Sequence, residues 1–110
     1  MKLIIAIVQD EDAGRLISAM MKEGFGVTKL ATTGGFLRAG NTTLLIGTEE
    51  EKLEGCMGII ERVCRSRRQS INSSLGTFDT TIPAAGGSHV EIMIGGATVF
   101  VLSVDEFKKF

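Results

Sequence analysis

An unbroken apolar run near the N-terminus is the feature that most restricts the fold. Residues 2–9 read KLIIAIVQ, which is rich in Ile and Val and lacks polar alternation. Such a run is typical of a central strand that is covered on both faces. A second run, ATVFVL, opens a strand that we predict over residues 97–104. These two runs require a sheet with a large apolar area to cover.

Two helices are predicted from apolar residues at helical spacing. The first follows the acidic stretch that begins at Asp10, which supplies carboxylates for a helix N-terminus. Its apolar stripe comprises Ala13, Leu16, Ile17, Met20 and Met21. The second helix is expected to begin with a capping box of Thr48 and Glu51. Its stripe comprises Leu53, Met57, Ile60 and Cys64, with Val63 beside it.

The remaining pattern predicts short strands and one long loop. Further strands are expected over residues 27–33, 42–47 and 90–94, and residues 69–89 are expected to form a loop. The order strand, helix, strand, strand, helix, strands predicts an α+β, ferredoxin-like (βαββαβ) sandwich. With 110 residues, one domain over 1–110 is expected. Two helices cover only one face of the sheet, so the other face indicates an oligomer.

Charge and hydropathy exclude several classes of protein. Twelve Lys and Arg stand against 13 Asp and Glu, a net charge of −1, which gives no electrostatic case for duplex nucleic acid or an acidic membrane. No apolar run approaches the roughly 18 residues that span a bilayer. The N-terminal run lacks a small-residue cleavage site, so we interpret it as a strand rather than a signal peptide.

The cysteines and the single histidine argue against disulfide and metal chemistry. Cys56 and Cys64 lie eight residues apart on one predicted helix, roughly 12 Å, which is too far for a disulfide. They are expected to be reduced thiols in the cytoplasm. His89 stands alone and there is no Cys-x-x-Cys pair, so no metal site is predicted.

No motif in the sequence indicates an enzyme. The single histidine lies in a predicted loop, which argues against a Ser-His-Asp triad. The sequence contains neither the phosphate-loop motif nor the glycine pattern of dinucleotide-binding proteins. Four arginines gather near the end of the second helix, and we interpret them as cations at a helix C-terminus rather than as an anion site. They are Arg62, Arg65, Arg67 and Arg68.

The stretch TKLATTGGFLRAGNTTLLIG, residues 28–47, combines groups that suit a nucleotide. The Gly34-Gly35 backbone can approach an anion, and the hydroxyls of Thr28, Thr32 and Thr33 lie close by in sequence. Phe36 can stack on a ring, and Asn41 has the amide geometry that pairs with an adenine edge. A hairpin loop built from turn residues explains the same composition, so both interpretations stand on these residues alone.

The sequence resembles a known family over most of its length. Residues 29–43, the opening MKLIIAIVQDED and the closing IGGATVFVLSVDEF are similar to the PstA (DarA) family of PII-like signalling proteins, whereas residues 66–89 are not. The resemblance implies a PII-like homotrimer, non-enzymatic and cytoplasmic. It also implies that cyclic di-AMP binds in each cleft between subunits and that loop rearrangement signals to a downstream protein, here unknown.

The resemblance also implies which residues contact the ligand. The Thr28 hydroxyl and the Gly35 N–H would meet phosphate oxygens. Phe36 and Leu37 would wall one adenine, and Asn41 would read its edge.

Two further residues complete the implied site, and two positions depart from the family. The Gly47 backbone would approach the base, and Phe100 would line the cleft. Gly26 stands where members often carry arginine, and Lys109 where they often carry glutamine.

The alternative function is a PII-like trimer that senses another nucleotide, such as ATP, or a purely protein-binding regulator.

Overall fold

The structure, a computed structural model, describes residues 1–30, 40–72 and 89–110. Four strands form the main sheet and two form a separate ribbon. The elements in order are β1 (Lys2–Gln9), α1 (Asp10–Lys22), β2 (Gly26–Leu30), β3 (Asn41–Thr48), the short 3₁₀ turn η1 (Glu50–Lys52), α2 (Leu53–Cys64), β4 (Arg67–Asn72), β5 (His89–Ile94) and β6 (Ala97–Ser103).

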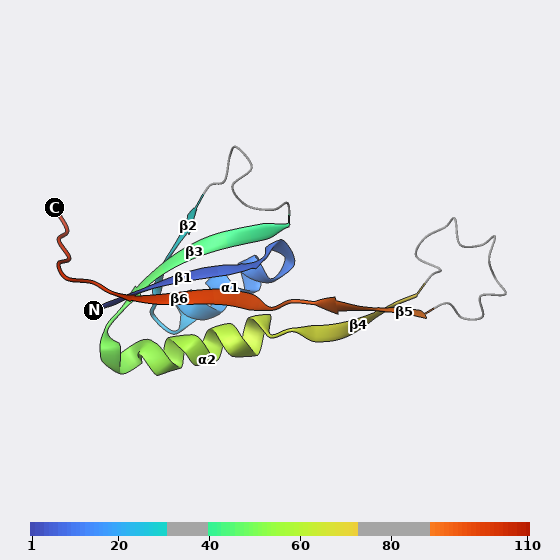
Figure 1. Cartoon of the computed structure of the whole chain (residues 1–110). Helices are drawn as coiled ribbons and strands as arrows, with labels where there is room; N and C mark the ends of the chain where they lie inside the picture. The colour runs from blue at the N-terminus through green and yellow to red at the C-terminus, as the bar shows by residue number, and fades with distance from the viewer. Residues whose placement is uncertain (31–39, 73–88) are drawn as a thin grey trace.

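The main sheet has the strand order β2-β3-β1-β6, and every neighbouring pair is antiparallel. Strand β1 is central and α1 and α2 pack on one face, an α+β arrangement compatible with the ferredoxin-like prediction (Figure 1). Strands β4 and β5 pair only with each other and project beyond one end of the sheet, and we call this ribbon the arm. The chain therefore consists of a layered body with an arm inserted between α2 and β6.

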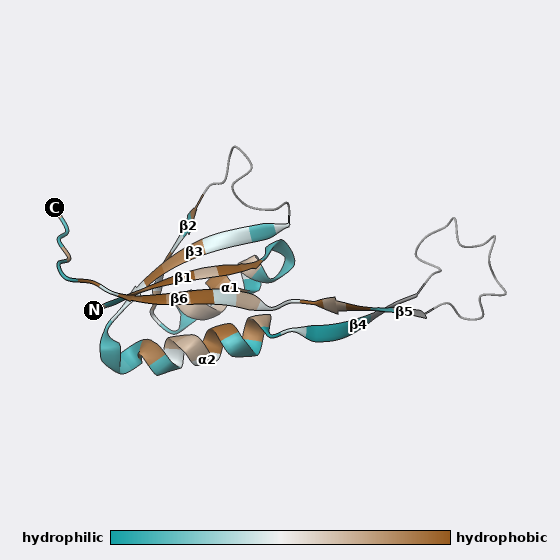
Figure 2. Cartoon of the chain, in the orientation of Figure 1, coloured by the Kyte–Doolittle hydropathy of each residue, from teal (hydrophilic) through white to brown (hydrophobic). Residues whose placement is uncertain are grey.

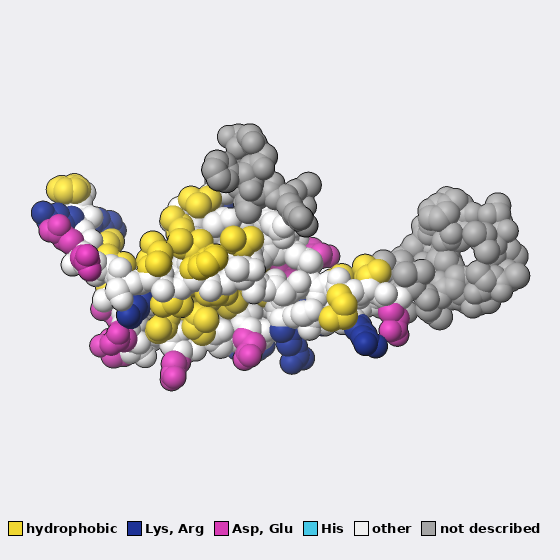
Figure 3. Space-filling view, viewed as in Figure 1, with side chains coloured by type: hydrophobic (Ala, Val, Ile, Leu, Met, Phe, Trp, Pro, Cys, Tyr) yellow, Lys and Arg dark blue, Asp and Glu magenta, His cyan; other side chains and the backbone are white. Residues whose placement is uncertain are grey.

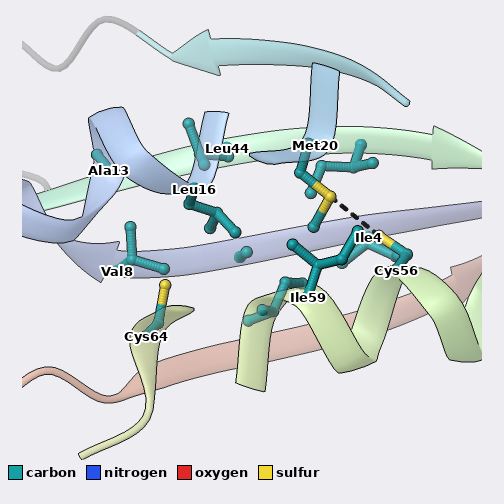
Figure 4. Packing of buried hydrophobic residues seen from close by; sticks show 12 residues of the cluster. Ile4, Val8, Ala13, Leu16, Met20, Leu44, Cys56, Ile59 and Cys64 are labelled. Carbon is teal, nitrogen blue, oxygen red and sulfur yellow. Dashed lines mark hydrogen bonds between the residues drawn. The ribbon is translucent and has the colours of Figure 1, made fainter. Parts of the chain in front are cut away.

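The core lies between the helices and the alternate residues of β1. Ile4, Ala6 and Val8 are completely or almost completely buried, because their side chains point toward the helices. Leu16 and Met20 of α1 belong to the same buried cluster, and α2 contributes both cysteines to it. Figure 4 shows this packing, in which the Cys56 thiol lies 3.8 Å from the Met20 sulfur.

Both helix predictions need correction in detail. Met21 is 65% exposed, so it lies outside the buried stripe of α1. The capping box is wrong, because the Thr48 hydroxyl donates to the Glu49 carbonyl and a 3₁₀ turn precedes α2. The buried stripe of α2 is also shifted from the predicted one and comprises Cys56, Ile59, Ile60 and Cys64.

The predicted loop over 69–89 is wrong at its ends. Strand β4 begins at Arg67 and β5 at His89, and the residues between Asn72 and His89 lie outside the described part of the chain. Arg67 and Arg68 therefore belong to a strand rather than to a helix end. Strand β4 begins with the hydrophilic residues Arg67, Arg68 and Gln69 (Figure 2), so periodicity gave no signal for it, whereas β5 lies within a residue of the strand predicted over 90–94.

Burial controls the chemistry of the two thiols. Cys56 and Cys64 are free and completely buried, and burial raises the pKa of each to about 11. Near pH 8 the folded protein should therefore react with N-ethylmaleimide roughly 100-fold more slowly than after denaturation, because the thiolate is the nucleophile. Mass spectrometry of timed samples measures this ratio. Equal rates in both states would contradict the buried placement of the thiols.

Candidate functional site

The face of the sheet turned away from the helices is apolar and uncovered in the single chain. We call it the open face. Its side chains alternate with the core residues along each strand. Phe100 of β6 is 52% exposed there, and Leu102 is 45% exposed. Figure 3 shows hydrophobic side chains gathered over these strands. The open-face residues of the central region are Leu3, Ile5, Ile7, Leu45, Phe100 and Leu102.

Two predicted site residues lie on this face but at opposite edges. Thr28 of β2 pairs with Leu45, Leu45 pairs with Ile5, and Ile5 pairs with Phe100. Three strand spacings separate Thr28 from Phe100, about 14 Å. The predicted hydroxyl and the predicted aromatic wall are therefore on one surface, but one chain does not bring them together.

Two glycines lie opposite each other on the open face. Gly26 of β2 pairs with Gly47 of β3, and neither has a positive φ. A Cβ added at Gly26 would meet no atom within 4 Å, and one at Gly47 would meet only the Met1 Cε, at 3.6 Å. The fold of a single chain thus gives no reason for either glycine. A glycine inside a strand often marks the close approach of a ligand or of another backbone.

Asn41 opens β3 at the other end of the strand. It pairs with Gln9 of β1, and the alternation of β3 places it on the open face with Gly47. Asn41 and Gly47 are six positions apart, about 20 Å along the strand. Because this length greatly exceeds one base, these two residues of one chain do not contact the same adenine. They mark two ends of an extended surface.

Three further predicted ligand contacts belong to the segment between β2 and β3. Gly35, Phe36 and Leu37 lie outside the described residues, as do Thr32, Thr33 and Gly34. The described chain therefore positions Thr28, Asn41, Gly47 and Phe100, all on the open face.

A buried ion pair was missed by sequence analysis. The Asp12 side chain is completely buried and accepts hydrogen bonds from Arg67 Nη2 at 2.8 Å and Arg15 Nη2 at 2.6 Å. The Arg67 guanidinium, followed by Arg15, holds the Asp12 pKa below its ordinary value against the effect of burial. Its stabilisation of the fold is therefore present above the ordinary aspartate pKa and is lost as pH falls through the lowered pKa. Nothing in the sequence near Arg67 indicates a partner 55 residues away.

Two surface pockets in the described part of the chain lie away from the open face. One of about 380 Å³ adjoins Asp12 and Arg67 at the base of the arm. Another, of about 350 Å³, lies between α2 and the start of β6. In the described residues no three His, Cys, Asp or Glu side chains are grouped to hold a metal ion. Nor does any helix in that part of the chain have the length and hydrophobicity to cross a membrane.

Comparisons with known proteins identify the family. A solved structure of a functionally unknown protein from Pediococcus pentosaceus ATCC 25745 is 39% identical in sequence. It superposes with a TM-score of 0.77 over 99% of this chain and 96% of that chain. The profile of a family described as cyclic-di-AMP receptor matches residues 1–110. A receptor family consists of binding and signalling proteins rather than enzymes. The match includes residues 66–89, over which the resemblance to PstA (DarA) proteins did not extend, and the chain belongs to the cyclic-di-AMP receptor family.

Proposed function

We propose that this chain forms a cytoplasmic, PII-like homotrimer of single domains, which binds cyclic di-AMP in the cleft between neighbouring subunits. It signals through rearrangement of the segments at that cleft to a downstream protein. Neither a metal nor a catalytic group takes part.

The distribution of the site residues over the open face carries this proposal. Thr28 and Phe100 lie about 14 Å apart on opposite edges of one sheet, with apolar Leu45 and Ile5 between them. Contact between the open faces of subunits covers this apolar surface and brings the β6 edge of one chain to the β2 edge of the next. Each cleft then contains Thr28 from one subunit and Phe100 from its neighbour.

The roles of the described residues follow from their chemistry. The exposed Thr28 hydroxyl donates to a phosphate oxygen, and Phe100 presents an aromatic surface to the ligand. Asn41 pairs through its amide with an adenine edge. The glycine pair Gly26 and Gly47 leaves the floor of the surface without side chains, so the second base or a sugar lies against the backbone. An extended dinucleotide suits contacts spread over about 20 Å.

The residues outside the described chain complete the proposed site. The Gly35 N–H binds a phosphate oxygen, and Phe36 and Leu37 wall one adenine.

A nucleotide panel in a thermal-unfolding experiment tests the ligand. Cyclic di-AMP at about 100 times its dissociation constant should raise the free energy of unfolding by about 2.7 kcal/mol per site. ATP, cyclic di-GMP and AMP at equal concentration are the comparison. A shift with ATP and none with cyclic di-AMP would replace this proposal with a sensor of another nucleotide. No shift with any nucleotide would favour a purely protein-binding regulator.

Asn41→Ala should weaken cyclic di-AMP binding by about 10- to 100-fold, because a bidentate amide–adenine contact is worth about 1–3 kcal/mol. The residue opens β3 at the sheet surface, so the trimer and its thermal stability should change little. Calorimetric titration measures the affinity, and Thr48→Val at the other end of the same strand is the matched control. Unchanged affinity in Asn41→Ala would remove this residue from the site.

A further inference from the structure

We infer that residues 9–12, where β1 passes into α1, couple the ligand-binding end of β3 to the arm. We call these four residues the junction. The contacts between the junction, β3 and the arm do not depend on any ligand. That this coupling transmits a signal rests on the proposed function. Asp12 and Arg67 are positioning residues in this account and do not touch the ligand.

The junction holds the beginning of β3 at three points. The Asp10 N–H donates to the Gly40 carbonyl at 2.8 Å, and the Thr42 hydroxyl donates to the Asp10 carboxylate. Gln9 is the cross-strand partner of Asn41. The Thr42 end of this bond is almost completely buried, whereas Asp10 is exposed. The residue proposed to read adenine is therefore fixed to the start of α1.

The same junction holds both sides of the arm. Arg67, the first residue of β4, donates from Nη2 to Asp12 Oδ1 at 2.8 Å and from Nη1 to Asp12 Oδ2 at 3.4 Å. Gly95, which follows β5, donates its N–H to the Gln9 side-chain carbonyl at 2.7 Å. The arm pairs with no strand of the main sheet, so these bonds, together with a backbone bond from Gly96 to the end of α2, hold it to the body.

The geometry at the base of the arm leaves little freedom. The Arg67 guanidinium forks across a completely buried carboxylate, which fixes its orientation as well as its distance. Gly95 has φ of +82°, and a Cβ there would come within 2.5 Å of Arg67 Nη1 and 2.6 Å of the Arg65 carbonyl. Only glycine fits beside the ion pair. A shift of the junction must therefore move the arm or break these bonds.

Gln9 is the shortest connection between β3 and the arm. Its backbone lies in β1 opposite Asn41, and its side chain accepts the Gly95 N–H. Asp10 and Asp12 follow it within one helical turn, one bonded toward β3 and the other toward β4. Ligand contact at Asn41 and arm position are thus linked through four consecutive residues. Linkage requires the effect to be reciprocal, so a change in the arm alters ligand affinity.

Amide-resolved hydrogen exchange in the ligand-free protein tests the coupling from both sides. Thr42→Val removes the hydroxyl at β3 and should speed exchange of the Gly95 N–H about fivefold or more. Arg67→Ala removes the guanidinium at the arm and should speed exchange of the Asp10 N–H, which is bonded to Gly40, by a similar factor. Arg15 still pairs with Asp12 in Arg67→Ala, so its carboxylate keeps a partner and the fold is retained.

Each variant has a matched control in the same strand. Thr48→Val makes the same replacement at the far end of β3, and Arg68→Ala removes an exposed arginine that pairs with Glu91 rather than with the body. Both controls should leave the distant amide unchanged. If Thr42→Val and Arg67→Ala leave the distant amides at the wild-type rate, or if the controls speed them equally, the coupling is overturned. Because the two test variants act from opposite ends, failure of one to fold leaves the other decisive.

Addition of cyclic di-AMP separates the coupling from the ligand proposal. In the wild type and in Arg68→Ala the ligand should slow exchange at both Asn41 and Gly95. In Arg67→Ala it should slow Asn41 only, with affinity about fivefold weaker. An unreduced response of Gly95 in Arg67→Ala would overturn the coupling. Cross-effects in the free protein without any response to cyclic di-AMP would sustain the coupling and refute the proposed ligand.

Discussion

A Gly47→Val variant should fold normally and bind cyclic di-AMP at least about 100-fold more weakly, a loss of about 2.7 kcal/mol. Within its own chain the added Cβ meets only the flexible end of Met1, at 3.6 Å, and valine suits a strand. On the open face, however, the new side chain occupies the floor on which the ligand is proposed to lie. Calorimetric titration gives the affinity, and thermal unfolding verifies the fold.

The control for this variant is Thr48→Val, which places a valine on the next residue of β3. Thr48 points to the helix side of the sheet and is almost completely buried there. It should bind cyclic di-AMP like the wild type. Wild-type affinity in Gly47→Val would show that no ligand lies against the glycine pair and would move the site elsewhere.

An Ile5→Glu variant should convert the proposed trimer to a monomer. Ile5 lies in the middle of the open face, between Leu45 and Phe100. In the single chain it is half-buried, so a glutamate there remains hydrated, whereas assembly would bury three unpaired carboxylates. An uncompensated buried charge costs about 3–5 kcal/mol. Light scattering at micromolar concentration measures the mass.

Met21→Glu is the matched control, because Met21 is an apolar residue of α1 that is 65% exposed on the opposite side of the body. This variant should remain trimeric. Ile5→Glu should also lose cyclic di-AMP binding, since Thr28 and Phe100 then no longer meet across a cleft. A trimeric Ile5→Glu variant, or a monomeric wild type, would show that the open face is not the subunit interface.

Most strands and both helices of the body were predicted, because the apolar pattern of each lies within its own short segment of sequence. The run KLIIAIVQ became β1 at the predicted residues 2–9, and β3 and β6 lie within a residue of their predicted boundaries. Strand β4 of the arm was not predicted, because RRQSIN lacks the apolar alternation of a half-buried strand, whereas β5 was predicted over residues 90–94. Strand β4 forms through pairing with β5 and through the Arg67–Asp12 ion pair, contacts between residues far apart in sequence.

The resemblance named candidate residues for the site but not their arrangement in space. Family resemblance indicated Thr28, Asn41, Gly47 and Phe100, and strand alternation places all four on one face. Their separation across the sheet depends on the order β2-β3-β1-β6, which no single segment specifies. Likewise the pairing of Gly26 with Gly47 is a matter of register between strands.

The contribution of the junction could not be read from sequence either. Gln9, Asp10 and Asp12 look like the end of a strand and a helix cap, and such residues are common at helix starts. Their significance comes from partners 30 to 90 residues away: the Thr42 hydroxyl, the Arg67 guanidinium and the Gly95 N–H. Such contacts appear only once the chain is folded.

Calorimetric titration of the wild-type chain with cyclic di-AMP, at a concentration where its mass has been measured, tests the central claim most directly. A site shared between subunits predicts saturation at one cyclic di-AMP per chain, three per trimer, and no binding by the Ile5→Glu monomer. Absence of cyclic di-AMP binding under conditions in which the protein is folded and trimeric would contradict the proposed ligand. Undiminished binding by a monomer would contradict a site shared between subunits.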